Sequence, residues 1–427
     1  MHFASRRVRA RTLVVATVMA VTLVAAGDAM AAVPQRTPSQ SVPGFDGKTI
    51  KVSGLGLAAN FFDSPVGAQA RFKRANDDNE LNGVKIEFGE FADDKNDAAT
   101  SVSEARRLVE QDNVFAIVPL ISASAPGAYL NQRKVPFFGW GFDKAYCGKG
   151  DTLYGFGFSG CVLPPDPTKV PDFSAGNPYR YLTQEKGIKN PTIAAIGTDT
   201  PAGKASMKSF IAQATGSGFK VVWAKPVLPP PPAVTGDYSP YVQEIMTSDN
   251  GKPPDAFFLA ASLTDALNMP KAFANAGYDG MLMSSYYSDA LVKPLAGTFV
   301  AMQFAPFEQN TAGIQQMKKD VEAFKPGTKP TTTMAAGYFA ADFFIKAVKK
   351  TGTKNLTRDA LQKTAAHMTY QIKGSVGPTQ YPKAFQALNT YCAGMVKSDG
   401  SAFTVTEPFT CTNHFTPVKK NAPDEVG

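Results

Sequence analysis

The sequence predicts an α/β protein made of two similar lobes, each built around a parallel sheet. Short apolar runs at 114–118 (VFAIV) and 135–138 (VPFF) are bounded by turn residues and separated by a helical segment. This pattern is typical of buried parallel strands in a βαβ unit. The same order returns at 256–260 (AFFLA) and 281–284 (MLMS), which indicates an internal structural repeat. A chain of 427 residues with 44% hydrophobic side chains is long enough for two such lobes.

The first residues have the features of a secretory signal peptide. Arginines at positions 6, 7, 9 and 11 precede an apolar run from Leu13 to Ala26 that is too short to span a membrane. Ala29-Met30-Ala31 is a small-x-small signal, so we expect cleavage after Ala31 and export to the periplasm, the cell envelope or the outside, by the Sec or the twin-arginine route. No cysteine lies at that boundary, so no lipid anchor is expected. Residues 32–47 are rich in Pro, Ser and Gln and predict a flexible tail.

The first half of the folded chain alternates strands and helices. A strand at Thr49–Leu55 is followed by a helix that begins at Asp63-Ser64-Pro65, where a capping residue precedes proline. A strand at Val84–Phe88 precedes a second helix, whose apolar residues recur at helical spacing. The buried face of that helix comprises Ala98, Val102, Ala105, Leu108 and Val109.

The second half repeats this order of elements. The expected strands are Thr192–Gly197, Lys220–Ala224, Ala256–Ala260 and Met281–Ser284, and the expected helices are Lys204–Thr215, Tyr241–Thr247 and Asp265–Ala276. After a returning strand at 298–307, further helices are expected at about Thr311–Phe324, Thr331–Lys350 and Thr357–Ala366. Strand-like pieces near Tyr391–Val396 and Phe403–Phe409 predict a hairpin packed on one lobe.

The four cysteines allow three pairings. We expect Cys147–Cys161 and Cys392–Cys411, because these pairings close loops of modest length inside single regions. Each would contribute about 3 kcal/mol on the loop-entropy model, and an exported protein permits disulfides. A zinc site is the poorer alternative, since the chain has no CxxC and no nearby histidine pair. No metal or cofactor is expected.

Several segments, taken in order, resemble the type I periplasmic binding proteins, specifically the leucine/branched-chain amino acid binding family of ABC importers. The resemblance spans roughly residues 48–415. The segments that carry it are IKVSGLG, VGAQARFKRANDDNELNGVKIEF, FADDKNDAATSVSEARRLVEQDNVFAIVPLISAS, VPFFGWGF, GDYSPYVQEI, PPDAFFLA, KAFANAGYDG and TTMAAGYFAADFFIKAV.

The resemblance implies two Rossmann-like lobes, joined by three crossings, that close over a small ligand by hinge motion. Lobe one would comprise 48–163 and about 300–350. Lobe two would comprise 164–299 and about 351–427. The implied partners are a small-molecule ligand and the permease subunits of an ABC transporter, and the fold allows a monomer.

The resemblance also implies where the ligand lies. In the family, a serine and backbone N–H groups after the third strand hold a ligand carboxylate, and here that loop carries Ser122, Ala123 and Ser124. Free N–H groups at a helix start suit an anion. Alternatively, the two serines only cap the helix. The next contact loop corresponds to Gly139 followed by Trp140, Gly141, Phe142 and Asp143.

Two parts of the family's amino-acid signature are missing. The acidic residue that holds the ligand's ammonium group falls on Tyr286, and the usual aromatic falls on Ala202. Asp143, Asp265 or Asp289 could substitute, although each fits a surface or capping position. We therefore expect an apolar or aromatic ligand with a carboxylate or other polar head. Its pocket would be lined by Phe61, Phe62, Trp140, Phe142, Tyr286 and Tyr287, with Tyr338 also facing the cleft.

Other classes of function fit the sequence less well. The histidines of the mature chain, His367 and His414, lie in no catalytic motif, and nucleophile, zinc-protease and nucleotide fingerprints are absent, so no enzyme is expected. The lysines are scattered without a basic stripe, which argues against nucleic-acid binding. An amino acid binding protein, a ligand sensor and a carrier without a permease remain alternatives.

Overall fold

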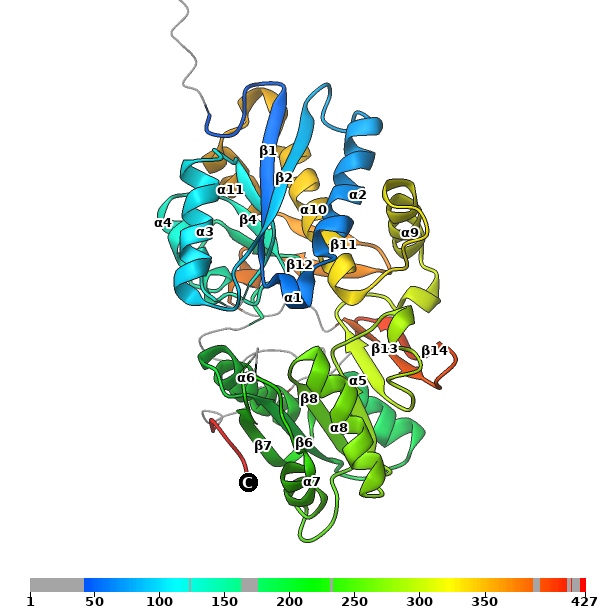
Figure 1. Ribbon diagram of the computed structural model, residues 1–427. Coiled ribbons are helices and arrows are strands. Elements are labelled where there is room, and N and C mark those ends of the chain that lie inside the picture. The colour runs from blue at the N-terminus through cyan, green and yellow to red at the C-terminus, as the bar shows by residue number, and fades with distance from the viewer. Residues whose placement is uncertain are drawn as a thin grey trace, which may run out of the picture. The chain divides into compact units, whose positions relative to one another are not determined.

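The computed structural model describes residues 42–122, 124–162, 176–230, 233–386, 392–412, 416 and 423–427 (Figure 1). The expected signal peptide with its cleavage at Ala31, most of the expected tail, Ala123 and His414 lie outside these residues. Within them, two mixed sheet-and-helix lobes are present, which confirms the predicted α/β fold class.

The first lobe contains a parallel sheet in the order β2-β1-β3-β4-β5. Its strands are β1 (Thr49–Gly56), β2 (Lys85–Asp93), β3 (Ala116–Ile121), β4 (Phe137–Gly139) and β5 (Gly155–Gly157). Every residue of β3 is buried, as its continuous apolar run predicts. Side chains alternate between two cores, so Ile117 and Leu120 pack beneath α3 (Ala98–Glu110) and α4 (Gly127–Gln132), whereas Ala116 and Val118 face α2 (Ser64–Asp77).

The second lobe contains a larger sheet in the order β14-β13-β10-β9-β8-β6-β7. Its parallel strands are β6 (Thr192–Thr198), β7 (Lys220–Leu228), β8 (Ala256–Ala260), β9 (Met281–Ser284) and β10 (Phe299–Met302). The antiparallel strands β13 (Ala393–Ser398) and β14 (Phe403–Thr410) extend it as the expected hairpin. The helices of this lobe are α5 (Gly176–Arg180), η3 (Tyr181–Glu185), α6 (Pro201–Ser217), α7 (Ser239–Met246) and α8 (Leu263–Asn275).

The chain passes between the lobes after β5, after β10 and again before β13. The second passage leads to α9 (Ala312–Phe324) and α10 (Thr332–Thr351), which pack in the first lobe. The remaining short helices are α1 (Ala58–Phe61), η1 (Lys144–Tyr146), η4 (Asp289–Leu291), η5 (Phe307–Gln309), η6 (Thr353–Asn355) and η7 (Lys383–Phe385).

The region after α10 differs from the expected lobe boundaries. Helix α11 (Arg358–Ala365) and the hairpin of β11 (Thr369–Ile372) and β12 (Val376–Gln380) belong to the first lobe, although we expected residues from about 351 onward in the second. The Arg358 guanidinium donates to the Phe115 carbonyl at 3.0 Å, and the Thr379 hydroxyl donates to the Phe158 carbonyl at 2.6 Å. These partners are distant in sequence, so local pattern could not reveal them. Strand β10 likewise lies in the second sheet, and it is shorter than the run at 298–307.

The start of the described chain is folded. Phe45 packs its ring against Phe115 with centroids 6.4 Å apart, and Lys51 N donates to the Gly44 carbonyl at 2.8 Å. Residues 42–47 therefore pack on the first lobe, which corrects the prediction that the flexible tail extends to residue 47.

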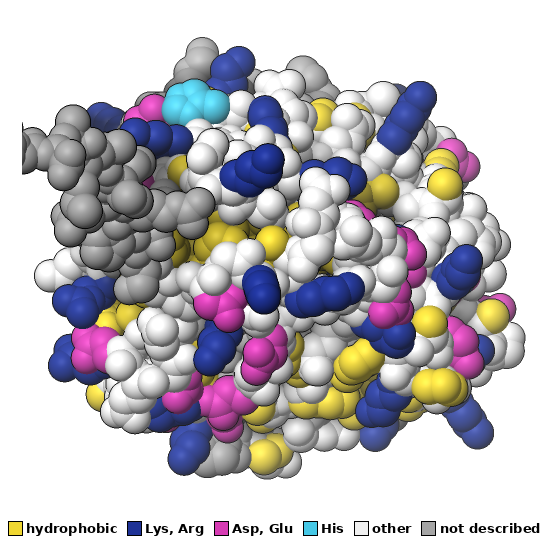
Figure 2. Space-filling view, turned by 90° about the horizontal axis from the view of Figure 1, so that it is seen from above, with side chains coloured by type: hydrophobic (Ala, Val, Ile, Leu, Met, Phe, Trp, Pro, Cys, Tyr) yellow, Lys and Arg dark blue, Asp and Glu magenta, His cyan; other side chains and the backbone are white. Residues whose placement is uncertain are grey.

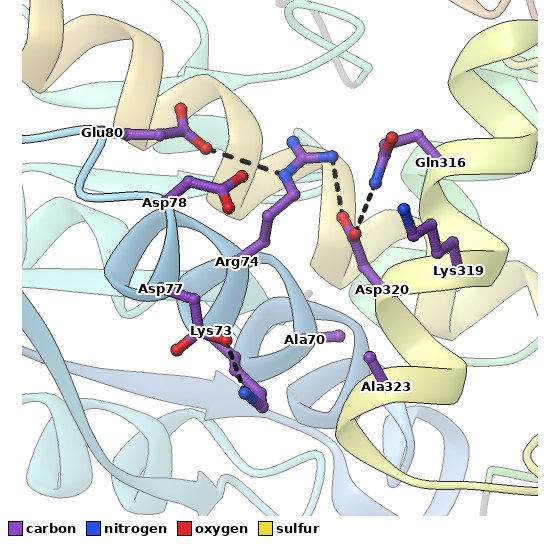
Figure 3. A pocket seen from close by; sticks show the side chains of 10 residues that line it. All are labelled: Ala70, Lys73, Arg74, Asp77, Asp78, Glu80, Gln316, Lys319, Asp320 and Ala323. Carbon is purple, nitrogen blue, oxygen red and sulfur yellow. Dashed lines mark hydrogen bonds and ion pairs between the residues drawn. The ribbon is translucent and has the colours of Figure 1, made fainter.

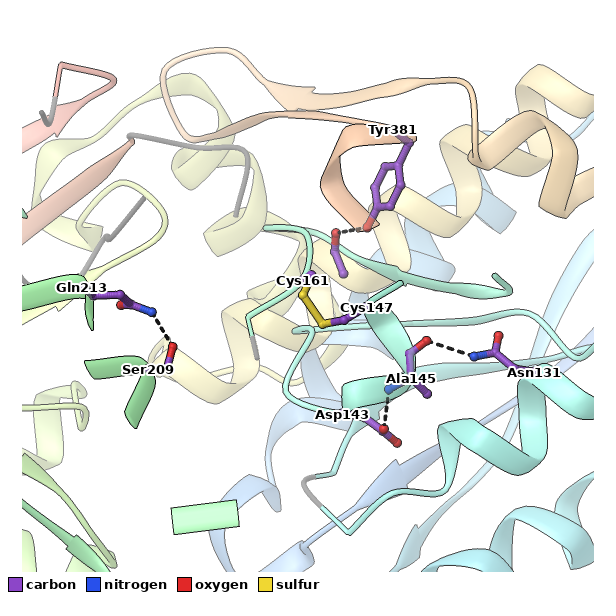
Figure 4. Close-up of a disulfide and its surroundings, with 9 residues drawn as sticks. Asn131, Asp143, Ala145, Cys147, Cys161, Ser209, Gln213 and Tyr381 are labelled. Carbon is purple, nitrogen blue, oxygen red and sulfur yellow. Dashed lines mark hydrogen bonds between the residues drawn. A yellow bond between two sulfur atoms is a disulfide. The ribbon is translucent and has the colours of Figure 1, made fainter. Parts of the chain in front are cut away.

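Both expected disulfides are present in the structure, Cys147–Cys161 and Cys392–Cys411. The first lies beside the loop that follows β4, where Asp143 accepts from Ala145 N and Asn131 donates to the Ala145 carbonyl (Figure 4). The second joins the two strands of the β13–β14 hairpin. Together they account for every cysteine of the chain.

The surface carries charges of both signs. On the face seen in Figure 2, Lys and Arg side chains lie among Asp and Glu side chains. Across the described ranges, helices of a length and hydropathy suited to crossing a bilayer are absent.

Candidate functional site

Loops at the carboxyl ends of parallel strands form the candidate site, because ligands of such sheets bind there. In the first lobe these loops follow β1, β3 and β4, and in the second they follow β8 and β9. The loop after β1 contains α1, whose first N–H, from Ala58, donates to the Asp93 carboxylate at 3.0 Å. Asp93 thereby connects the end of β2 to the helix that carries Phe61 and Phe62.

In the loop after β3, the hydroxyl of Ser122 is already engaged. It donates to the buried carboxylate of Asp94 and accepts from Ser124 N at 3.0 Å. Asp94 also accepts from Asn96 N at 2.8 Å. Burial raises the pKa of Asp94, and its bond with Ser122 opposes that shift. Neither serine caps α4, so the capping alternative is wrong.

Asp143, and neither serine, accepts a hydrogen bond from the first N–H of α4. Its carboxylate accepts from Gly127 N, the first residue of α4, at 2.7 Å and from Ala145 N at 2.8 Å. The side chain is 1% exposed, and burial raises its pKa. This geometry assigns Asp143 to holding α4 and its own loop in place, and it gives no support to the expected ligand contact. Gly141, at φ 94°, lies so close to the Gly160 carbonyl that a side chain there would clash.

Trp140 and Phe142 lie together. Their ring centroids are 5.0 Å apart, and the Trp140 ring is 6.0 Å from that of Phe158. Trp140 is 8% exposed, and its indole N–H donates to the Gln303 side-chain oxygen at 2.9 Å. Gln303 directly follows β10, so this bond joins the loop after β4 to a passage between the lobes.

The two tyrosines after β9 differ in environment. Tyr286 is half-buried and donates to the Ala261 carbonyl at 3.1 Å, and burial raises its pKa. Tyr287 is 2% exposed; its ring stacks on Phe307 at 4.6 Å, and its hydroxyl donates to Glu308. Tyr287 is therefore a packing residue in this structure.

Tyr338 also lies away from these loops. Its hydroxyl donates to Asp320 of α9 at 2.5 Å, and the side chain is 2% exposed. This contradicts the expectation that Tyr338 faces the cleft. The sequence-predicted residues that keep accessible surface are Phe61, Phe62, Ser124, Phe142 and Tyr286.

The carboxylates that could replace the family's acidic residue have other environments. Asp265 is 3% exposed and accepts from the Tyr238 hydroxyl at 2.8 Å and from Ser262 at 2.5 Å. Asp289 is exposed in η4. Asp143 and Asp265 are therefore both buried and already engaged, whereas Asp289 is exposed.

Asp94 and Gln303 are residues of this region that sequence reasoning did not assign to it. Asp94 belongs to the adjacent carboxylates Asp93 and Asp94, which are visible in the sequence. Gln303 is a polar residue inside the apolar run at 298–307, and this interruption of the run is a signal in the sequence.

His367 is exposed and pairs with Asp151 at 3.1 Å. Clusters of three or more metal-ligating side chains are absent from the described part of the chain.

A cavity of about 510 Å³ lies elsewhere, between α2 and α9 (Figure 3). Its walls carry charged side chains that pair with one another. Arg74 contacts Asp320 at 2.8 Å, Gln316 donates to the same carboxylate at 2.7 Å, and Lys73 pairs with Asp77. This groove lacks the apolar walls expected of the ligand site.

Comparison with known proteins places this geometry in a family. A family model described as periplasmic binding protein matches residues 50–401. A search of curated proteins gives no match. Among solved structures, the chain is similar to a fatty acid ABC transporter substrate-binding protein from Thermomonospora curvata, at 18% identity and a TM-score of 0.69, covering 90% of this chain and 97% of that one.

Two further structures bind different ligands in the same fold. A solute-binding protein of an ABC transporter from R. palustris, solved in complex with benzoate, is 16% identical, with a TM-score of 0.64 over 87% of this chain and 100% of that one. A branched-chain amino acid transporter substrate binding protein from Streptococcus pneumoniae, solved in complex with isoleucine, is 18% identical, with a TM-score of 0.60 over 84% and 100%. Because the family model matches well over half of the chain, this protein belongs to the periplasmic binding protein family and has the type I fold of its leucine-binding members.

Proposed function

We propose that this protein is the extracytoplasmic solute-binding component of an ABC importer. It captures a small apolar or aromatic ligand with a polar head between its two lobes, which close by hinge motion, and it delivers the ligand to permease subunits. Membership in the family and the solved relatives of ABC transporters support this role.

The observation that carries the ligand class is the environment of Tyr286. An ammonium group needs a carboxylate or an aromatic cage, and a tyrosine with a raised pKa supplies no negative charge. Asp143 and Asp265 are buried and already accept hydrogen bonds. A ligand without a free α-amino group fits these residues better than leucine does.

Phe62 supplies the apolar surface. It is 69% exposed, and in the described chain it and Val234 are the exposed large hydrophobic side chains. Phe62 follows α1 at the carboxyl end of β1, where a ligand of the first lobe would lie. An exposed aromatic ring at a strand end is stabilised when a ligand or the opposite lobe covers it.

We predict that decanoate or benzoate raises the thermal unfolding midpoint of the mature protein, and that leucine does not, because a ligand that binds only the folded state stabilises it. Phe62→Ala should weaken the affinity for that ligand about tenfold or more, as expected for the loss of a covered Phe side chain. Isothermal titration measures both quantities.

Val234→Ala is the matched control, because it removes the other exposed apolar side chain, which lies in the loop after β7. It should leave the affinity unchanged. Tighter binding of leucine than of both carboxylates would overturn the ligand class. An unchanged affinity in Phe62→Ala would remove Phe62 from the site.

A further inference from the structure

The amide of Gln303 holds a buried hydrogen-bond donor that nothing in the described chain satisfies. An indole N–H can only donate, so the amide oxygen of Gln303 must face Trp140. The amide nitrogen is then fixed on the other side, and it has no hydrogen-bond partner although the side chain is 1% exposed. Buried polar groups are nearly always paired, so an unpaired one needs a reason.

The position of Gln303 is fixed on both sides. Met302 pairs with Gly394 in the second sheet, and Phe304 forms a bridge with Val376 of the first lobe. Ala305 N donates to the Ser375 carbonyl at 2.8 Å. Gln303 is thus the residue at which the chain leaves one lobe for the other, and its amide is held at their junction.

The indole to which the amide is bonded lies among aromatic rings. Trp140 contacts Phe142 and Phe158 through its ring and Gln303 through its N–H. A small number of fixed polar groups among apolar walls is the usual composition of a small-molecule site. The amide nitrogen of Gln303 offers two N–H groups of this kind.

Ser122, the residue that the resemblance suggests for a ligand carboxylate, is poorly placed to donate. Its single hydroxyl proton is directed to Asp94, and its oxygen already accepts from Ser124 N. A carboxylate directly behind the serine also disfavours an anion at that loop. The Ser122 hydroxyl therefore does not supply the side-chain donor that an acceptor-bearing head group needs.

We infer that Gln303 is a specificity-determining residue, whose amide nitrogen donates to the acceptor oxygen of the ligand's polar head, a carboxylate or a carbonyl, while Trp140 fixes the orientation of the amide. This inference rests on the proposed function, because it assumes a ligand held between the lobes. It adds that Gln303 recognises the head group.

The test uses two substitutions of matched size in the mature protein. Gln303→Met removes both N–H donors together with the oxygen that accepts from Trp140. Gln303→Glu keeps an oxygen for Trp140 while presenting a second oxygen where the donors were. For whichever of decanoate and benzoate binds the wild-type protein, affinity should fall about tenfold in Gln303→Met, as expected for a lost hydrogen bond to a charged group. It should fall further in Gln303→Glu, where two carboxylates would face each other. Gln243→Met, on an exposed position of α7, should bind as wild type does.

A second measurement requires no ligand. If the amide nitrogen is kept for a ligand, Gln303→Met should leave the thermal midpoint of a ligand-free Trp140→Phe protein unchanged or higher, because an unpaired buried donor is removed and no indole N–H is left without its acceptor. A midpoint several degrees below that of Trp140→Phe alone, with Gln243→Met unchanged from wild type, would mean that the amide is structural and would overturn the inference, whether or not a probe binds.

The outcomes separate the two proposals. If wild type binds a carboxylate and both Gln303 variants bind it equally well, the inference is overturned and the proposed function stands. If neither decanoate nor benzoate binds wild type while leucine does, the proposed ligand class is overturned, and the ligand-free measurement alone decides the role of Gln303. In a Trp223→Phe background, a change in Trp140 emission on binding would support a head group beside Gln303, and unchanged emission would count against it.

Discussion

Asp94 is a buried carboxylate whose ionisation opposes folding. It is fully buried behind Ser122, and desolvation raises its pKa above the ordinary value of 3.8. Asp97, a few residues on, has the opposite environment: it is exposed, and hydrogen bonds from Thr100 at the start of α3 lower its pKa. Two carboxylates of one loop should therefore respond to pH in opposite directions.

We predict that wild type loses stability relative to Asp94→Asn as the pH rises above the ordinary aspartate pKa of 3.8. A group with a raised folded pKa stabilises the fold fully below its unfolded pKa, and this contribution is lost as the pH rises through the folded value. Urea unfolding at several pH values measures the difference between the two proteins.

Asp97→Asn serves as the control for this experiment. Its pKa is lowered in the folded state, so the wild-type carboxylate stabilises the fold above its unfolded pKa and loses that contribution as the pH falls. A gap between wild type and Asp94→Asn that does not change with pH would contradict the prediction.

For single residues, the sequence predicted the location of Trp140 but not its hydrogen-bond partner. Its loop at the end of β4 could be expected from the strand pattern, and the structure places Trp140 there. Its hydrogen bond goes to Gln303, which is 163 residues away. The same limit applies to Ser122, because only the folded chain shows that Asp94 accepts its hydrogen bond.

Among the elements, α2 and α10 make an unusually close contact. An added Cβ at Gly337 would lie 1.9 Å from the Ser64 carbonyl oxygen, and one at Gly67 would lie 1.9 Å from the Met334 carbonyl oxygen. The two helix backbones therefore touch at reciprocal glycines. Most of α10 is buried around this contact, as its apolar sequence predicts.

We predict that Gly337→Ala destabilises the protein by about 1–3 kcal/mol, because the added methyl must push α2 and α10 apart. Helix propensity alone would give the opposite sign, since alanine is favoured over glycine by about 1 kcal/mol in a helix interior. Chemical unfolding measures the change.

Gly236→Ala is the control for the helix contact, because a Cβ there would meet nothing within 4 Å. It should change the free energy of unfolding very little. A Gly337→Ala protein as stable as wild type would mean that the helices can separate freely at this point.

Whether a segment forms a helix or a strand was largely predictable wherever its apolar residues recur at a clear spacing. Most strands from Thr49 to Ser284 and most helices between them lie close to the expected ranges, because their apolar periods differ clearly, although α1 and β5 were not expected. The β11–β12 hairpin was not predicted, since residues 369–380 have a weak alternation with glycines. The assignment of this hairpin to the second lobe was also wrong, because its partners lie in α10 and in the loop after β5.

The whole molecule combines the two sheets through shared packing as well as through the three passages. Val396 and Phe403 of the β13–β14 hairpin pack in the same core cluster as Phe304 and Phe339. The fold class and the repeat followed from the order of elements alone. The assignment of residues after 351 did not, because it depends on contacts between distant parts of the chain.

We predict that a reducing agent lowers the thermal unfolding midpoint of the whole protein. The disulfides close loops of 14 and 19 residues, and each restricts the unfolded chain by about 3 kcal/mol on the loop-entropy model. Differential scanning calorimetry with and without the reductant measures the shift.

A variant with all four cysteines replaced by serine is the control, since its midpoint should not respond to the reductant. The same midpoint for wild type with and without complete reduction, checked by thiol labelling, would contradict the prediction.

The edge strand β7 of the second sheet is paired at one point with the C-terminal residues of the chain. Val426 exchanges two backbone hydrogen bonds with Ala224, at 2.7 and 3.0 Å, and Asp424 pairs with Lys208 of α6. An unpaired edge strand is a template on which another chain can add its own strand. Residues 424–427 therefore occupy part of this edge. Their loss by proteolysis would leave the backbone N–H and carbonyl of Ala224 unpaired, and these groups could then pair with a strand of another copy of the protein.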